Sequence, residues 1–363
     1  MSLSPLAAAQ DRGVISRYRE FLPVDANTPV ISLNEGSTPL IYSPKLSSIA
    51  GAEVFLKYEG LNPTGSFKDR GMTVALSLAV GRGATTVICA STGNTSAAAA
   101  AYAARASVTC AVLLPAGKIA KGKLVQAFAY GAKVIAIEGN FDDALRLVRE
   151  AGTRPGIAIV NSINPDRIEG QKTAAFEIIE ALGCAPEIHM LPVGNAGNIT
   201  AYWKGYKEFH ALGRATTLPR VIGFQASGSA PIFFGATVEH PETKASAIRI
   251  GNPASWPGAS NAISESRGAI DIVTDDEILA AQRWLASNEG IFVEPASAVS
   301  VAGLMKCRSK DRCNSCPFAT SGGGPIVLTV TGHGLKDPDT VIEQLEETGS
   351  VPATLDAVLE ALG

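Results

Sequence analysis

The chain has 363 residues, of which 46% are hydrophobic and 18% charged, and its net charge at pH 7 is -3. A chain of this length and apolar content can bury two large cores, so we expect a globular protein with two lobes. The weak negative charge argues against nucleic acid as a partner, because nucleic-acid-binding proteins carry broad basic surfaces. No apolar run approaches the roughly 18 residues of a membrane span, and the N-terminus lacks a secretory signal pattern. We therefore expect a cytoplasmic protein with no membrane partner.

Strands and helices are predicted to alternate along most of the chain. After a short helix and loop over 11–23, the first half is predicted to hold strands at 53–58, 85–90, 108–114, 133–137 and 157–160, and helices at 72–80, 95–105, 121–130, 142–150 and 169–182. The second half is predicted to hold strands at 188–192, 221–225 and 326–330, and helices at 199–212, 277–287 and 296–306. Two stretches, 231–266 and 307–324, show no regular pattern.

This alternation is typical of α/β proteins, in which helices cover parallel sheets and ligands bind at the carboxyl ends of the strands. We predict two lobes, each an open, mostly parallel sheet covered by helices, with the site in the cleft between them. The larger domain is predicted to be discontinuous, comprising residues 1–57 and 160–363, with residues 58–159 inserted as a smaller α/β domain.

One lysine stands out, because it follows a run of turn-forming residues and precedes an apolar helix. Residues 62–71 read NPTGSFKDRG, and Lys68 lies where the helix begins. The positive end of the helix dipole favours the neutral form of an amine at that place, and a neutral amine can attack a carbonyl to form a Schiff base. A lysine at a turn is also commonly a solvated surface charge, so this stretch alone leaves both interpretations open.

Two small polar loops are predicted to follow strands and to open helices. Residues 91–96, STGNTS, place backbone N–H groups and hydroxyls where they can face an anion; the alternative is a helix capped by Asn94 or Thr95. Residues 194–198, GNAGN, contain two glycines in five positions, which allows successive N–H groups to point inward as a phosphate cradle. Neither loop matches the dinucleotide or Walker patterns, which argues against NAD and ATP.

Two further motifs lie at strand ends. Residues 161–173 link a strand to a helix and carry Arg167, whose planar guanidinium suits a phosphate or a carboxylate. The alternative for Arg167 is a salt-bridged arginine at a helix start. Thr331 follows the apolar strand at 326–330, where its hydroxyl either bonds the backbone or meets a heteroaromatic nitrogen.

The six cysteines do not indicate a disulfide framework, since the first three lie in apolar stretches. Cys307, Cys313 and Cys316 belong to a segment that resembles an insertion before the last core strand. No fourth ligand is evident nearby, and structural zinc sites are nearly always four-coordinate. We therefore expect a surface loop with free thiols and no metal site.

Together, the motifs resemble those of the threonine synthases, which are pyridoxal 5'-phosphate enzymes with the fold of the tryptophan synthase β subunit. The resemblance spans about residues 34–338 and rests on NPTGSFKDRG at 62–71, STGNTS at 91–96, the long motif at 161–173, GNAGN at 194–198 and TGHGLKD at 331–337. Related dehydratases and cysteine synthases share the lysine turn and a Ser-x-Gly-Asn loop, but they usually carry a more glycine-rich cradle. The assignment to threonine synthases therefore depends on 161–173 and 194–198.

The resemblance implies a reaction and a cofactor. O-phospho-L-homoserine would lose its α and β protons, expel phosphate from the γ carbon and take up water at the β carbon, giving L-threonine. Pyridoxal 5'-phosphate would lie in the cleft and belong mainly to the large cofactor-binding domain. Lys68 would be the catalytic residue, binding the cofactor as a Schiff base and moving protons at the substrate carbons. We also expect a homodimer.

The resemblance implies a role for each motif residue as well. Asn94 would contact the phenolic oxygen of the cofactor and Thr331 would face its pyridine nitrogen. The cofactor phosphate would be held by the backbone of Gly194, Asn195, Ala196, Gly197 and Asn198. The substrate would be bound by Ser91, Thr92 and Thr95 near its carboxylate, and by Lys123, Asn161, Ser162 and Arg167 near its phosphate.

Two alternatives stay open. A pyridoxal-phosphate-dependent threonine or serine dehydratase would share the lysine turn but would have no use for Lys123, Ser162 and Arg167. A catalytically silent homologue that binds the cofactor or a partner is disfavoured, because Lys68 is retained together with every residue of the cofactor loops.

Overall fold

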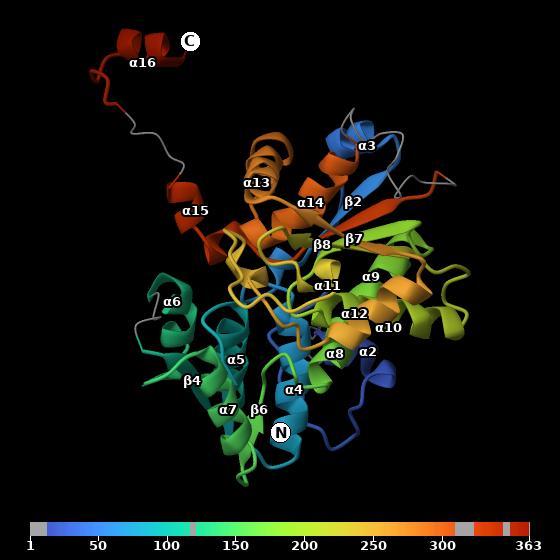
Figure 1. The fold of residues 1–363 in the computed structure, drawn as a ribbon, viewed down its shortest axis with the longest axis vertical. Coiled ribbons are helices and arrows are strands. Elements are labelled where there is room, and N and C mark those ends of the chain that lie inside the picture. The colour runs from blue at the N-terminus through green and yellow to red at the C-terminus, as the bar shows by residue number, and fades with distance from the viewer. Residues whose placement is uncertain (1–12, 117–120, 309–322, 344–348, 363) are drawn as a thin grey trace.

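Two sheets organise the computed structural model, which describes residues 13–116, 121–308, 323–343 and 349–362. The larger sheet has the strand order β1-β2-β10-β7-β8-β9, and the smaller has the order β5-β4-β3-β6. Every neighbouring pair is parallel except β1 and β2, which are antiparallel. The predicted α/β class with two mostly parallel sheets is confirmed, and Figure 1 shows the small sheet and its helices beside the large one.

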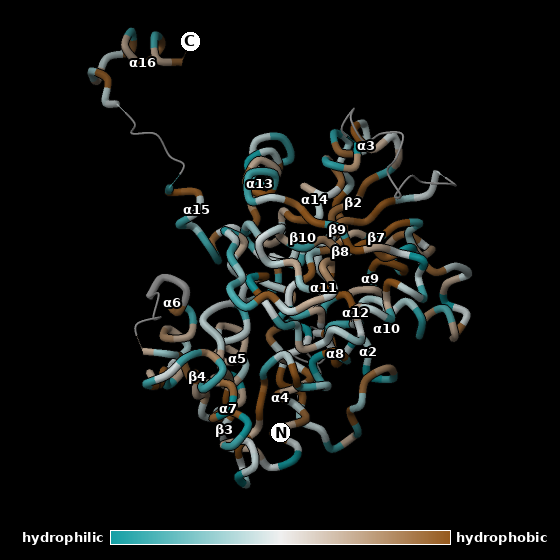
Figure 2. The backbone as a smooth tube through the Cα atoms, in the orientation of Figure 1, coloured by the Kyte–Doolittle hydropathy of each residue, from teal (hydrophilic) through white to brown (hydrophobic). Residues whose placement is uncertain are grey.

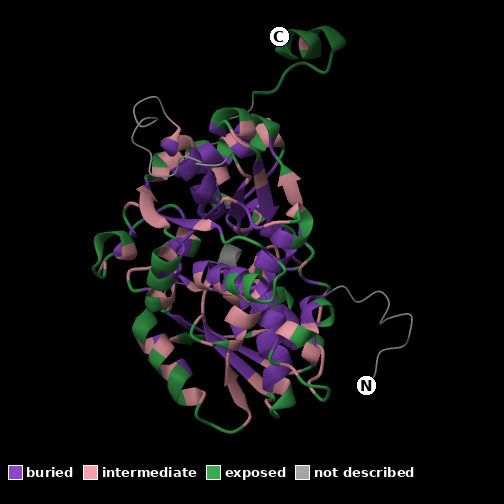
Figure 3. Ribbon diagram, turned by 90° about the vertical axis from the view of Figure 1, so that its right-hand side faces the viewer, coloured by how far each residue is buried: buried purple, intermediate pink, exposed green. Residues whose placement is uncertain are grey.

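The strands of the large sheet are β1 (Leu40–Tyr42), β2 (Val54–Tyr58), β7 (Ile188–Pro192), β8 (Arg220–Ala226), β9 (Ala269–Val273) and β10 (Ile326–Val330). Those of the small sheet are β3 (Thr86–Ala90), β4 (Thr109–Pro115), β5 (Lys133–Ile137) and β6 (Ile157–Ile159). Their central strands are near-continuous apolar runs, because helices cover both faces of each sheet. Figure 3 shows these strands as buried, with the exposed residues on the outer helices.

The small sheet is covered on one face by α4 (Lys68–Gly81), α5 (Asn94–Ala106) and α6 (Lys121–Ala129), and on the other by α7 (Phe141–Ala151). Alternate residues of β3 settle this: Val87 and Cys89 pack with the first group of helices, and Ile88 and Ala90 pack with α7. Helix α4 also contributes Val74 and Leu78 to a core of the large sheet. The helix that begins at Lys68 therefore lies between the two sheets.

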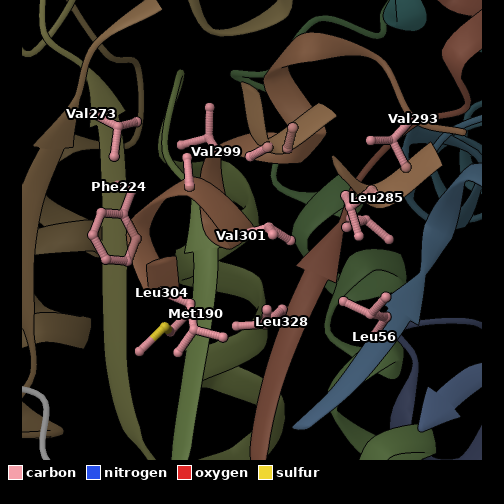
Figure 4. Close-up of a cluster of buried hydrophobic side chains, with 14 of the residues drawn as sticks. Leu56, Met190, Phe224, Val273, Leu285, Val293, Val299, Val301, Leu304 and Leu328 are labelled. Carbon is pink, nitrogen blue, oxygen red and sulfur yellow. The ribbon is translucent and has the colours of Figure 1, made fainter. Parts of the chain in front are cut away.

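The large sheet likewise has two cores. One contains α3 (Pro44–Ala50), η3 (Ser246–Ile248), α13 (Asp275–Glu289) and α14 (Pro295–Cys307). Figure 4 shows this core, with Leu56, Met190, Phe224 and Leu328 of four neighbouring strands facing residues of α14 such as Val301. The opposite core contains α2 (Val14–Tyr18), α9 (Thr173–Leu182), α10 (Gly197–Ala211) and α12 (Trp256–Glu265). In Figure 2 the strands between these cores form a continuous hydrophobic band.

The remaining described elements are short or peripheral. They are η1 (Arg19–Phe21), η2 (Glu59–Leu61), α8 (Asp166–Gln171), α11 (Pro231–Phe234), η4 (Gly334–Lys336), α15 (Asp339–Ile342) and α16 (Leu355–Leu362). Helix α16 projects away from the body in Figure 1 and buries none of its residues. None of the helices in the described ranges has the length and apolar character to cross a membrane.

The predicted strands at 133–137, 188–192 and 326–330 have the observed bounds, but three expectations were wrong. The helix predicted over 169–182 is divided at Lys172 into α8 and α9. Residues 231–266 contain α11, η3 and α12, where weak helix formers are held by the burial of Ala259 and Ala262. Strand β9 was missed, because this edge strand is mostly half-buried and lacks an uninterrupted apolar run.

Cys307 is the last residue of α14 and is buried in a core of the large sheet. The expectation that it lies in a surface loop is wrong, because the apolar face of α14 continues to this position. Cys313 and Cys316 lie outside the described residues, so the expected absence of a metal stays a prediction.

Replacing Cys313 and Cys316 with serine should leave both activity and the melting temperature unchanged. Cys307→Ser should lower the melting temperature, because it places a hydroxyl in an apolar core. Elemental analysis showing stoichiometric zinc that is lost in the double variant would contradict the absence of a metal.

A buried ion cluster fixes α4 against the large sheet. Arg70 donates to both oxygens of Glu59 at 2.7 and 2.8 Å and to both oxygens of Glu177 at 2.8 and 2.6 Å. Lys57 completes the cluster at 2.6 Å from Glu177. Burial disfavours the charged carboxylates, but the nearby cations outweigh it and hold the pKa values of Glu59 and Glu177 below the usual range. The cluster ties β2, η2, α4 and α9 together two residues from Lys68.

Glu177→Gln should destabilise the fold by about 3–5 kcal/mol, because it leaves buried cations without their partner. The lowered pKa values mean that the contribution of the cluster is complete above the ordinary glutamate pKa and is lost as the pH falls through the folded-state values. Urea unfolding at a series of pH values measures both effects. Glu150→Gln is the matched control, because Glu150 pairs with Arg146 at 2.8 Å on an exposed helix surface and should change the unfolding midpoint little. Equal midpoints for the two variants would contradict the prediction.

Candidate active site

The loop that carries Lys68 is joined to the end of β10. Ser66 forms an antiparallel bridge with Gly332, and the Phe67 amide donates to the Thr331 carbonyl at 3.0 Å. The turn before it requires Gly65, whose φ of 86° is unfavourable for residues with a side chain. Lys68 is the first residue of α4, as the sequence predicts, and it therefore lies where the two sheets meet.

The Lys68 amine has an apolar neighbour and no salt bridge. Its Nζ lies 4.1 Å from the centre of the Phe67 ring, and no hydrogen bond or ion pair links it to another residue in the described ranges. Burial, reinforced by the positive charge of Arg167 and partly opposed by Glu294, lowers the pKa of Lys68 to about 7. The lowered pKa leaves more of the amine neutral near pH 7 than in a solvated lysine, so Lys68 is suited to act as a nucleophile.

This pKa gives a direct prediction. In the cofactor-free protein, acylation of Lys68 should rise with pH and level off above a midpoint near 7, because only the neutral amine reacts. Peptide mass spectrometry after brief treatment with acetic anhydride measures this, normalised to the exposed Lys133 in the same sample. A Lys68 profile that runs parallel to that of Lys133 up to pH 10 would show that the amine is not perturbed.

Arg167 lies beside Lys68 because two helices cross closely. A side chain at Gly71 of α4 would meet the Arg167 carbonyl oxygen at 2.7 Å, and one at Gly170 of α8 would collide with the Arg70 carbonyl. The two glycines thus let α4 and α8 pack closely, and Figure 1 draws the two helices next to each other. The predicted motif that carries Arg167 therefore lies next to the helix that begins at Lys68.

The Arg167 side chain is 1% exposed yet weakly paired. Its Nη1 donates to the Val160 carbonyl at 3.2 Å, and its Nε has no hydrogen-bond partner. Burial lowers the pKa of Arg167 to about 10. No salt bridge to Arg167 exists among the described residues, so the alternative of a salt-bridged arginine is wrong. A buried guanidinium with an unpaired N–H is costly to the fold and is placed to bind an anion.

Asn94 is the first residue of α5 and is held by an acid from the other end of the chain. Its Nδ2 donates to both carboxylate oxygens of Glu294, at 2.9 and 3.1 Å. The N-cap of α5 is Gly93, so the alternative in which Asn94 or Thr95 caps this helix is wrong. Glu294 precedes α14 and its backbone N–H donates to Gly332, which places Asn94 beside the loop of Lys68.

Thr331 follows β10 and its hydroxyl is paired with another hydroxyl. Thr331 Oγ1 lies 2.8 Å from Ser297 Oγ, and Ser297 also accepts from the Gly332 amide at 2.6 Å. Of the two predicted uses of the Thr331 hydroxyl, a bond to the backbone is not formed within the described part of the chain. The pair is buried at the carboxyl end of the central strand, where neutral hydroxyls can meet a heteroaromatic nitrogen.

Residues 194–198 form a curled turn between β7 and α10. Ala196 has a φ of 63° and serves as the N-cap of α10. Amides in the first turn of a helix have no acceptor within it, so they are available to an anion. Asn198 is 7% exposed and its Nδ2 has no partner. Gly197 faces Ile168, which follows Arg167, so this turn borders the same cluster.

The other residues predicted to bind the substrate follow strands β3 and β6. Ser91, Thr92 and Thr95 lie at the carboxyl end of β3 and the start of α5, next to Asn94. The side-chain amide of Asn161 makes two hydrogen bonds to the Ala90 backbone. Its Oδ1 accepts from the Ala90 N–H, and its Nδ2 donates to the Ala90 carbonyl, both at 3.0 Å. Its amide thus joins β3 to the loop after β6, and its predicted contact with the substrate stays a prediction.

Two further residues were predicted to bind the substrate phosphate, Ser162 and Lys123. Ser162 is half-buried in the turn between β6 and α8. Lys123 lies in α6, but its side chain falls outside the described residues.

The sequence analysis did not predict three polar residues near Lys68, Asn94 and Thr331. These are Glu294, Ser297 and Lys336. Lys336 donates to the Thr64 carbonyl at 3.1 Å and also contacts Gln126 of α6, so it joins the two sheets next to the lysine loop. The signal for Glu294 was its position before Pro295, where a helix begins in otherwise apolar sequence.

A model of the pyridoxal-phosphate-dependent enzyme family matches residues 31–332. Among curated proteins, the chain is 57% identical to a threonine synthase of Mycobacterium leprae over 97% of this chain and 96% of the relative. It is 54% identical to a threonine synthase of Synechocystis over 98% of this chain and 92% of the relative.

Solved structures of the same fold include maize serine racemase, with a TM-score of 0.74 at 20% identity over 92% of this chain and 97% of that one. A threonine deaminase of Solanum lycopersicum matches with a TM-score of 0.70 at 23% identity over 85% of this chain and 83% of that one. Both of these likenesses concern the fold alone. By the family model and by its near-full-length identity to curated relatives, the chain belongs to the pyridoxal-phosphate-dependent enzymes and, within them, to the threonine synthase family.

Proposed function

We propose that this enzyme converts O-phospho-L-homoserine and water into L-threonine and phosphate. The relatives at 51–57% identity are threonine synthases, and that reaction needs a group that binds a second phosphate beside the one on the cofactor. The buried Arg167, with an unpaired Nε next to Lys68, is the observation that carries the proposal. A dehydratase acting on serine or threonine has no anion to compensate such a charge.

The residues of the site fit pyridoxal phosphate. The turn at 194–198 offers backbone amides at the start of α10 and the unpaired amide of Asn198, which suits the cofactor phosphate. The Thr331 and Ser297 hydroxyls suit the pyridine nitrogen, and they cannot protonate it fully as a carboxylic acid would. When bound, pyridoxal phosphate supplies the electron sink that allows the α and β protons to leave the substrate and phosphate to depart from Cγ.

Lys68 has two tasks in this proposal. Its amine binds the cofactor, and after the substrate takes its place, the free amine accepts the proton from Cα and moves protons at Cβ and Cγ. A pKa of about 7 suits an amine that must both take up and release protons near neutral pH. The Phe67 ring, centred 4.1 Å from Nζ, gives the half-buried amine a partly apolar surrounding.

The substrate is held at both ends. Arg167 binds the departing phosphate, and its charge stabilises the dianion as the bond from Cγ to oxygen breaks. Ser162 and Lys123 are proposed to assist there. Ser91, Thr92 and Thr95 are proposed to bind the substrate carboxylate, because hydroxyls and first-turn amides of α5 lie at that end of the site.

The experiment is to incubate the purified protein with O-phospho-L-homoserine and to measure phosphate and threonine together. We expect equal molar amounts of both products. Phosphate release without threonine would instead indicate elimination to a keto acid, and turnover of serine or threonine as efficient as that of the phosphorylated substrate would favour a dehydratase.

The expectations of a cytoplasmic homodimer and of domain boundaries at 57/58 and 159/160 stay predictions. Light scattering after size-exclusion chromatography tests the dimer, cell fractionation tests the compartment, and limited proteolysis tests the boundaries.

A further inference from the structure

Glu294 is a buried acid whose side chain neither caps its own helix nor forms an ion pair within the described residues. It is the N-cap residue of α14 but makes no side-chain cap bond, and it is 4% exposed. No salt bridge to Glu294 is formed within the described ranges, whereas the equally buried Glu59 and Glu177 are both paired with Arg70. A buried carboxylate without a cationic partner destabilises the fold, so its retention calls for a role in the site.

The hydrogen-bond partner of Glu294 is the side-chain amide of Asn94, which has an NH₂ end that donates and an oxygen end that accepts. A carboxylate only accepts hydrogen bonds, so it can pair only with the NH₂ end of Asn94, and both of its oxygens do so. The bond therefore fixes which end of the Asn94 amide faces which way. Gly332 is required beside it, because a side chain there would collide with the Glu294 carboxylate.

We propose that Glu294 is a positioning residue: its carboxylate holds Asn94 in one orientation toward the phenolic side of the cofactor and sets a negative charge close to Lys68. The inference rests on the proposed function only for the placement of the cofactor beside Asn94. Glu294 itself is given no bond to the substrate and no proton transfer.

Charged groups from two elements influence this carboxylate: Lys68 from α4, and Lys336 and Asp337 from η4 and its end. The backbone of His333 bridges Val293, and burial lowers the pKa of His333. Burial raises the pKa of Glu294 to about 7, while Asn94 and the two lysines oppose that rise and Asp337 adds to it. Above that pH the carboxylate is charged, and removing this charge should make the Lys68 nitrogen easier to deprotonate.

The test uses the cofactor-loaded enzyme and the variant Glu294→Gln, which keeps the shape but can turn its own NH₂ toward Asn94. We expect the dissociation constant of pyridoxal phosphate to rise about tenfold, as for loss of a hydrogen bond to a charged group. The midpoint of the pH titration of the visible cofactor band should fall by roughly one pH unit. Glu35→Gln is the matched control, because Glu35 is fully buried but is bonded to Tyr102 and the Val14 amide rather than to Asn94.

A double-mutant cycle tests whether Glu294 acts through Asn94. In an Asn94→Ala background, Glu294→Gln should change the dissociation constant by less than about twofold, because the amide to be oriented is gone. The shift of the spectral midpoint should persist, since it depends on the charge alone. A tenfold effect in both backgrounds would overturn the orienting role.

An unchanged dissociation constant and midpoint in Glu294→Gln would overturn the proposal altogether, as would equal changes in Glu35→Gln. These readouts need no turnover. Failure of the unmodified enzyme to form threonine would instead count against the proposed function and leave the cofactor titrations interpretable.

Discussion

Lys68→Ala should lower the formation of threonine by at least about 10³-fold, because one substitution removes the group that binds the cofactor and the group that moves protons. The fold should persist. The Lys68 amine has no salt bridge in the described part of the chain, and burying its charge costs stability that alanine would restore. Steady-state assays, circular dichroism and thermal unfolding of the same samples separate the two effects.

Lys68→Arg should be as inactive as Lys68→Ala, because a guanidinium keeps the charge but is never a neutral nucleophile near pH 7. Lys133→Ala, at an exposed position, should behave like the unmodified enzyme. Reduction of the unmodified enzyme with borohydride should attach the cofactor to the peptide that contains Lys68. Attachment to another lysine, or an alanine variant with a tenth of normal activity, would contradict the assignment.

Arg167→Leu should lower kcat/KM for O-phosphohomoserine by about 10- to 100-fold, the loss expected for a charge-assisted bond to phosphate. Cofactor affinity and the spectral response to simple amino acids should be nearly unchanged, because the cofactor phosphate is assigned to 194–198. The thermal midpoint should stay equal or rise, since the substitution replaces a buried, poorly paired charge with an apolar side chain. Such a trade of activity against stability distinguishes a binding residue from a structural one.

The matched control is Arg82→Ala. Arg82 lies 3.1 Å from Asp166, the residue before Arg167, but its side chain is 66% exposed, so its loss should leave kcat/KM within about twofold. Arg167→Leu should also raise the pKa of Lys68, because a positive neighbour is removed, and the acylation midpoint should move to higher pH. Loss of cofactor from Arg167→Leu, or an effect of equal size in Arg82→Ala, would argue against a substrate-phosphate site.

The sequence was most informative where function depends on local structure. Lys68 and the turn at 194–198 were predicted to belong to the site because each lies at a strand end or a helix start, and chain order alone brings such positions to one edge of a parallel sheet. Arg167 was found from its motif, although its burial and its missing salt bridge were not. Asn161 was expected to bind substrate, but its amide is bound to the Ala90 backbone, a use that no local pattern distinguishes.

Contacts between distant residues were beyond the reach of such patterns. Asn94 and Glu294 are 200 positions apart, and their pairing depends on how α5 and α14 meet across the two sheets. Lys336 likewise has a role only because η4 lies against the turn before Lys68. Strand β9, a weakly apolar edge strand, was not predicted because it is stabilised by packing in the folded sheet rather than by intrinsic propensity.

The pairing of β2 with β10 has a consequence for how the enzyme is made on the ribosome. All four strands of the small sheet lie between residues 86 and 159, so this sheet can close while the rest of the chain is still being synthesised. Strand β2, in contrast, is bordered by β10, the last strand among the described residues, and the loop of Lys68 gains its bonds to Thr331 and Gly332 only after β10 has emerged. Contacts so distant in sequence form late. Nascent chains that have not yet exposed β10 should therefore be unable to capture pyridoxal phosphate.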